Sequence, residues 1–124
     1  MSAPLTTLYR PVGRKELDLI RASEFRRFPP RLLGQPFFYP VLAEEYAVQI
    51  ARDWNTKDEA SSYEGYVLKF DVRSEFLKRY EVHVVGDFTH REYWIPAEDL
   101  ESFNRNIEGP IEVIGSFAAK AARS

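Results

Sequence analysis

The 124-residue chain contains no cysteine, which excludes a disulfide framework, a thiolate metal site and a cysteine nucleophile. It has only two histidines, His83 and His90, and these alone do not supply the ligands of a structural zinc site. His83 lies in an alternating segment, on the face opposite Val82 and Val84, so we expect it to be a solvent-facing strand residue. We expect no bound metal ion.

Signature motifs and long apolar runs are missing as well. The chain lacks the GxGxxG, GxxxxGK[ST], HExxH and GxSxG patterns. No stretch approaches the roughly 20 apolar residues that a membrane-spanning helix needs. Residues 1–10 also lack the apolar centre of a signal peptide. We therefore expect a cytoplasmic protein that does not enter a membrane.

The chain also has no large excess of either charge sign. With 17 Lys and Arg against 19 Asp and Glu, the net charge is -2, whereas general nucleic-acid binding needs a basic surplus. Apolar and aromatic residues, in contrast, make up 44% and 15% of the chain. A chain of this size can bury about two-thirds of its unfolded surface. We expect one domain over residues 1–124, with a core from about residue 6 to residue 117 and frayed ends.

Apolar periodicity and turn residues divide the chain into short strands and helices. Alternating or aromatic segments predict strands, at residues 6–12, 37–39, 66–72, 80–84, 92–95 and 111–117. Helical spacing of apolar residues predicts helices, at residues 14–22, 41–54, one turn in 73–79, and 96–107. Turn residues predict breaks, at 24–35, 55–64, Gly86-Asp87 and Gly109-Pro110.

The order of these elements decides the fold class. Strands cluster in the second half with short connections, and no glycine-rich turn joins a strand to a helix. Both features disfavour a doubly wound parallel sheet. The sequence therefore predicts an α+β domain with mainly antiparallel strands.

Three segments place reactive side chains beside apolar anchors. Arg10 lies in an apolar first strand, where it needs an anionic partner if buried, or reaches water from a sheet edge. The aromatic segment Phe37-Phe38-Tyr39 forms either a wall on which a planar ring stacks or plain core packing. Glu92 precedes an aromatic strand. It is either a carboxylate at the rim of a site, where rings on both sides control its pKa and hydrogen bonding, or a surface residue in a turn. His90 lies two residues earlier, so in a strand it faces the same side as Glu92.

Taken in order, these segments resemble the ADP-ribosyltransferase superfamily. Leu8-Tyr9-Arg10 is similar to its opening strand, Phe37-Phe38-Tyr39 falls where its middle strand is expected, and Glu92-Tyr93-Trp94-Ile95-Pro96 has the spacing of its late Glu-x-x-x-Pro element. The chain is also similar to a group of short bacterial proteins labelled ADP-ribosylation/crystallin-like. The resemblance covers about residues 6 to 117 and implies split antiparallel β-sheets with three or four short helices.

The resemblance implies NAD as substrate, no metal, and transfer of ADP-ribose to an unknown acceptor, either a protein or water. Glu92 would stabilise the positive charge that develops on the ribose, and Arg10 would hold the diphosphate or the adjacent ribose. Tyr39 would stack on nicotinamide, with Tyr9 and Phe38 completing the cofactor-binding set. His90 would position the acceptor or a ribose hydroxyl.

The sequence departs from the superfamily in two respects. A Ser-Thr-Ser element is absent, and His90 stands where some members carry an acceptor-orienting Glu or Gln, so transfer to Arg or Asn side chains is not implied. A second interpretation therefore stays open: a non-catalytic module with the same fold that binds a nucleotide or a protein. Arg26 and Arg27, close to Phe25 and Phe28, suit a protein interface.

Overall fold

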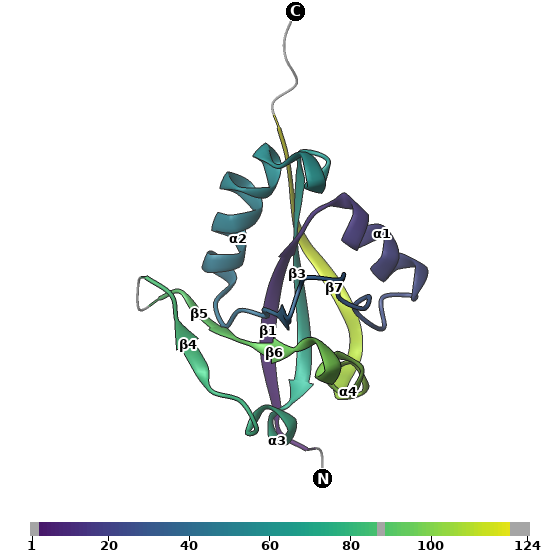
Figure 1. Ribbon diagram of the computed structural model, residues 1–124, viewed down its shortest axis with the longest axis vertical. Helices are drawn as coiled ribbons and strands as arrows, with labels where there is room; N and C mark the ends of the chain where they lie inside the picture. Colours follow the sequence, from purple (N-terminus) through teal and green to yellow (C-terminus); the bar gives the residue numbers. More distant parts are fainter. Residues whose placement is uncertain (1–2, 87–88, 120–124) are drawn as a thin grey trace, which may run out of the picture.

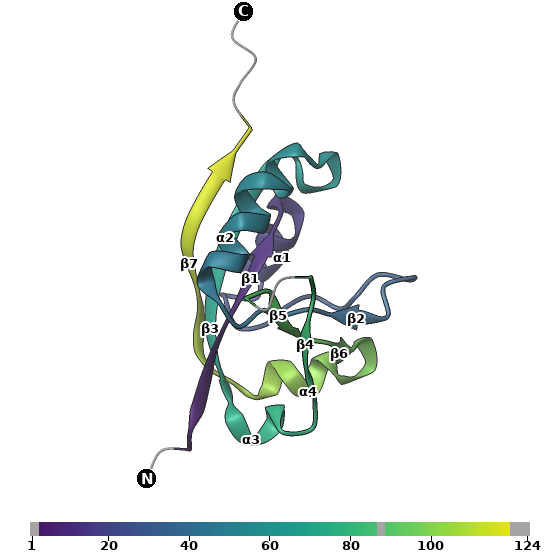
Figure 2. The ribbon, with the colours of Figure 1, turned by 90° about the vertical axis from the view of Figure 1, so that its left-hand side faces the viewer.

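A three-stranded antiparallel sheet forms the centre of the computed structural model, which describes residues 3–86 and 89–119 (Figure 1). Its strands, in the order β1-β3-β7, are β1 (Leu5–Val12), β3 (Glu64–Arg73) and β7 (Ile107–Ala118). Two small antiparallel pairs lie to one side of it, namely β2 (Phe37–Phe38) with β6 (Ile95–Pro96), and β4 (Val82–Val84) with β5 (Arg91–Tyr93) (Figure 2). The predicted turn residue Asp87 and the tail beyond residue 119 lie outside the described residues.

Short helices connect the strands. They are α1 (Arg14–Ala22), α2 (Glu44–Asp53), α3 (Ser74–Leu77) and α4 (Leu100–Arg105), with 3-10 turns at Asn55–Lys57, Glu59–Ser61 and Ala97–Asp99. These helices and antiparallel strands confirm the α+β prediction. None of the helices among the described residues has the length and the apolar run of a membrane-spanning helix.

The core is divided between the two sides of β3. Leu68, Phe70 and Val72 alternate along β3 and join the larger cluster, which also contains residues of α1 and α4. Val67, with the opposite orientation, packs against α2 through Ala47 and its neighbours. The pleat of one strand therefore fixes helices α1 and α2 relative to the same sheet.

A cluster of aromatic rings supports the segment before α2. The Phe38 side chain is fully buried, and its ring centroid lies 4.9 Å from that of Phe28 and 5.2 Å from that of Phe103. Phe28 lies in turn 4.8 Å from Phe70 of β3. Such tilted and edge-to-face pairs stabilise the core beyond simple burial, so residues 37–39 have a fixed position beside the sheet.

Two predicted boundaries are wrong because strand pairing overrides the local pattern. Helix α2 begins at Glu44 instead of Val41, since Val41 is extended and bridges Tyr9 on one side and Glu92 on the other. Strand β7 begins at Ile107, so Gly109 and Pro110 lie within it and do not end a helix. Gly109 has a φ of 78° where the β3–β7 register shifts, a conformation that glycine adopts without strain.

The predicted orientation of β4 is reversed. Val82 and Val84 are 40% and 56% exposed, whereas His83 is half-buried. The His83 ring stacks on Trp94 at a centroid distance of 3.9 Å. The segment alternates with the period of a strand, as predicted, but its half-buried side packs against Trp94 and not against the apolar core.

Candidate functional site

A cavity of about 760 Å³ is lined by the end of β1 and by residues of α1 and α2. These two helices lie on either side of β1 (Figure 1). The volume of the cavity falls within the range of about 300–1,000 Å³ that is typical of small-molecule sites. Its lining comes from the end of β1, the start of α1, residues 29–35, one face of α2 with the turns that follow it, and β5. Another hollow, of about 510 Å³, lies near α3, away from the predicted site residues.

The cavity opens where the chain leaves β1 after Val41. Tyr9 and Val41 exchange two backbone hydrogen bonds of 2.9 and 2.8 Å, and Val41 in turn bridges Glu92. After Val41 the chain turns away into α2, so the next part of β1 faces the cavity. Arg10 through Gly13 line it. A guanidinium and a carboxylate 82 residues apart are thereby brought to one wall.

Arg10 lies in this wall with an internal anionic partner. Its Nε and Nη2 donate to the two carboxylate oxygens of Glu16 at 2.6 and 2.8 Å, a bidentate pair. The Arg10 Cζ also lies 4.5 Å from the Phe38 ring centroid. The partner expected for a buried Arg10 is therefore supplied by α1. The sequence analysis missed Glu16, whose only signal was its position in the first turn of a predicted helix.

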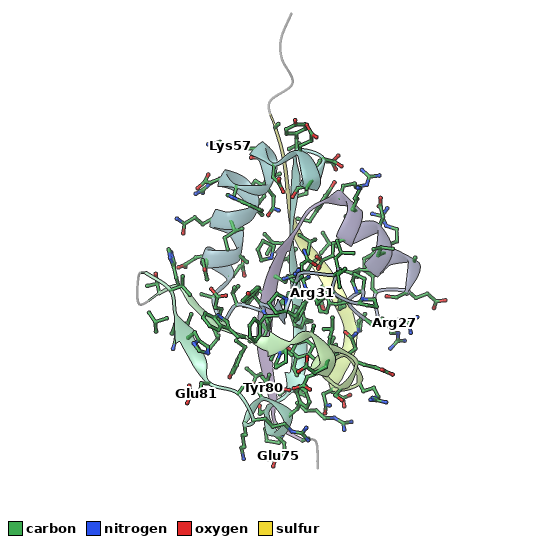
Figure 3. All side chains as sticks on the ribbon, in the orientation of Figure 1. Arg27, Arg31, Lys57, Glu75, Tyr80 and Glu81 are labelled. Carbon is green, nitrogen blue, oxygen red and sulfur yellow. The ribbon has the colours of Figure 1, made fainter. Side chains whose placement is uncertain are left out.

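Arg31 is a second guanidinium of the cavity that the sequence analysis missed. Its Nη1 lies 4.0 Å from Glu16 Oε1, and its Nε donates to the Phe37 carbonyl at 3.1 Å. Its side chain is 13% exposed and lies centrally in the view of Figure 3, whereas Arg27 lies at the edge and points outward. Burial and, next, the charge of Arg10 lower the Arg31 pKa. Two arginines thus share one carboxylate, so these three side chains together carry one net positive charge.

Glu92 is held at one end of the cavity by Tyr46 of α2. The Glu92 residue is 8% exposed, and its Oε1 accepts a hydrogen bond of 3.0 Å from the Tyr46 hydroxyl. Burial, followed by the Glu92 carboxylate, raises the pKa of Tyr46 to about 12. Tyr46 therefore keeps its proton at neutral pH and acts as a donor. The sequence analysis did not single out Tyr46, which lies within the predicted helix at residues 41–54.

The remaining predicted residues lie either in the cavity wall or behind it. Tyr39 lines the cavity, and its ring meets that of Trp94 edge-on at 6.2 Å. His90 stacks behind Tyr46 at 4.4 Å, with its Nε2 3.1 Å from Gln49 Oε1. Phe38 lies in the core and Tyr9 packs against the Val41 cluster. The structure thus brings Arg10, Tyr39 and Glu92 to one cavity, with the other three behind them.

The opposite end of the cavity is polar and lies in a segment that was predicted only as a loop. Asn55 Nδ2 donates to Ser61 Oγ at 2.9 Å, and Ser61 Oγ donates to Asp58 Oδ2 at 2.7 Å. Asn55 Oδ1 is buried and has no hydrogen-bond partner among the described residues. Trp54, 62% exposed, lies next to this group. Polar loop composition was the only signal for these residues.

Neither metal-ligand geometry nor similarity to known proteins adds to this description. Among residues 3–86 and 89–119, no three His, Asp or Glu side chains gather in a way that could hold a metal ion. No protein-family model matches the chain, and no curated protein matches it significantly.

Proposed function

We propose that the protein binds NAD in this cavity, cleaves the bond between nicotinamide and ribose, and passes ADP-ribose to an acceptor or to water. The observation that supports this proposal is the convergence of Arg10, Tyr39 and Glu92, from three distant segments, on one cavity of suitable volume. We also propose an ADP-ribosyltransferase-like fold, which is supported by the isolated antiparallel bridges of Val41 to Tyr9 and to Glu92.

The chemistry requires a fixed carboxylate beside the ribose. When the C1′–N bond breaks, its electron pair leaves with nicotinamide and positive charge develops on the ribose. Glu92 accepts a hydrogen bond from the ribose 2′-hydroxyl, and its negative charge stabilises the positive charge on the ribose. An acceptor hydroxyl or water then adds to C1′ and loses its proton. With water the products are ADP-ribose, nicotinamide and one proton.

The other side chains hold the two halves of the substrate in place. Tyr46 engages Oε1 of Glu92 and so turns Oε2 toward the ribose. Arg10 and Arg31, with one net positive charge after pairing with Glu16, attract the diphosphate. The Tyr39 ring stacks on the nicotinamide. His90, stacked on Tyr46, fixes the orientation of that ring.

The proposal is tested by measuring nicotinamide release from NAD by wild type and by Glu92→Gln. Loss of one charge-stabilising group costs about 10²–10³ in rate, so the variant should release nicotinamide at most at about a hundredth of the wild-type rate. Glu81→Gln is the matched control, because Glu81 points outward from the fold in Figure 3. If NAD raises the melting temperature but no nicotinamide appears, the cavity only binds the dinucleotide and the catalytic proposal is wrong.

A further inference from the structure

The contacts of the cavity place its polar end at a defined distance from Glu92. Tyr46, which bonds Glu92, and Trp54 lie on the same face of α2 and its cap, eight residues apart, or about 12 Å along the helix axis. On the β1 side, Arg10 lies next to the Tyr9–Val41 bridge, and Gly13 touches Ser61, since a Cβ at Gly13 would lie 2.5 Å from it. The order along the cavity is therefore Glu92, the arginines, and then the Asn55–Asp58–Ser61 group.

The charges follow the same order. Glu92 lies at the Val41 end of the cavity and Asp58 at the Gly13 end, and Arg10 lies on β1 between these two points. Arg31 is joined to Arg10 through Glu16. A dinucleotide has the complementary order, with a ribose diol, a diphosphate and a second ribose diol. The cavity carries three cationic and three acidic side chains in all (Arg10, Lys15, Arg31; Glu16, Asp58, Glu92), so it is patterned and not a general anion trap.

The polar end contains a carboxylate and an amide oxygen as hydrogen-bond acceptors. Ser61 gives its proton to Asp58 Oδ2 and accepts from Asn55, so both its hydrogen-bonding roles are filled. Asn55 is 5% exposed, and its Oδ1 has no donor among the described residues. A buried acceptor without a donor is unfavourable, so a ligand hydroxyl fits this end better than a phosphate. Trp54 adds an exposed aromatic face on which a purine can stack.

We infer that this end binds the adenosine half of NAD and selects NAD over NADP. The inference rests on the proposed function and extends it to a part of the substrate far from the reacting bond. The adenosine ribose donates its 2′- and 3′-hydroxyls to Asp58 and Asn55, and the adenine stacks on Trp54. A 2′-phosphate removes one donor and brings negative charge against the Asp58 carboxylate, so NADP is rejected.

The test is calorimetric titration of the protein with NAD, NADP and AMP. Because a hydrogen bond to a charged group is lost with NADP, wild type should bind NAD at least about tenfold more tightly than NADP. Asp58→Asn keeps an acceptor for Ser61 and should bring the two affinities within about threefold of each other. Glu59→Gln is the matched control, since Glu59 is an exposed neighbour outside the cavity lining and should leave both affinities unchanged.

A second variant keeps the test valid if Asp58→Asn does not fold. Trp54 is largely exposed, so Trp54→Leu should fold normally and weaken AMP binding by about fivefold or more. AMP binding that depends on Asp58 and Trp54 supports the inference even if NAD is never cleaved. Equal affinities for NAD and NADP in wild type, together with nicotinamide release that depends on Glu92, overturn the inference and leave the proposed function standing. Absence of binding by all three ligands overturns both.

Discussion

The hydrogen bond from Tyr46 to Glu92 gives the sharpest single perturbation of the site. Tyr46→Phe removes the hydroxyl that donates to Oε1 at 3.0 Å and keeps the ring that stacks on His90. Because Tyr46 is half-buried, we take the lower end of the range for a bond to a charged group, about 1.5 kcal/mol. For a chain of this length the melting temperature should fall by about 5–9 °C.

The same substitution should separate positioning from binding. If Tyr46 orients Glu92 toward the ribose, its loss should lower kcat for nicotinamide release about tenfold, the rate equivalent of about 1.4 kcal/mol. KM should change by less than about threefold, because the phenyl ring still lines the cavity. A melting temperature and a kcat equal to those of wild type would show that the bond neither stabilises the fold nor positions the carboxylate.

The bond also predicts a pH dependence of stability. The pKa of Tyr46 is raised from 10.0 to about 12, by burial first and by Glu92 second. Since the folded value lies above the unfolded one, the contribution is complete below pH 10 and is lost as the pH rises to about 12. Urea titrations across this range should show a smaller loss in Tyr46→Phe than in wild type. Tyr80, whose pKa is also raised to about 12, adds the same slope to both proteins.

Two further predictions concern the frame of the cavity. Gly65→Ala should lower the free energy of unfolding in urea by about 1–3 kcal/mol, because a Cβ there would overlap the backbone of α2. Gly115→Ala is the control and should be close to neutral, since the nearest atom to its Cβ would lie at 3.6 Å. Equal costs would contradict the packing described for α2. Glu16→Gln should lower the melting temperature, since it leaves Arg10 without its anion, and yet tighten binding of inorganic pyrophosphate in calorimetry. Unchanged pyrophosphate affinity would show that the guanidiniums do not contact the diphosphate.

The spacing of apolar residues was enough to predict the elements that do not compete with another strand for backbone hydrogen bonds. Helix α1 was predicted with its observed bounds, Arg14–Ala22, because Gly13 precedes it and Leu17 and Ile20 repeat at helical spacing. Strand β3 alternates strongly enough to be found within two residues at its start and one at its end. Where another strand competes for the backbone, as at Val41 and Ile107, the local pattern gave the wrong boundary.

Part of the site could also be predicted from local sequence. Arg10, Tyr39 and Glu92 stand out locally as reactive groups beside apolar segments, and the structure brings all three to one cavity. Their partners depend on tertiary contacts. Glu16 reaches Arg10 only because the chain reverses after β1, and Tyr46 meets Glu92 from another element. Asp58 acquires its position from two 3-10 turns that composition alone does not reveal.

A crystal structure with an NAD analogue whose nicotinamide–ribose bond resists cleavage would show whether one dinucleotide lies along this cavity. This binding mode predicts a ribose hydroxyl at the Glu92 carboxylate, the diphosphate beside Arg10 and Arg31, and the adenine against Trp54. An analogue bound elsewhere on the protein, or bound here with its diphosphate away from both arginines, would contradict it.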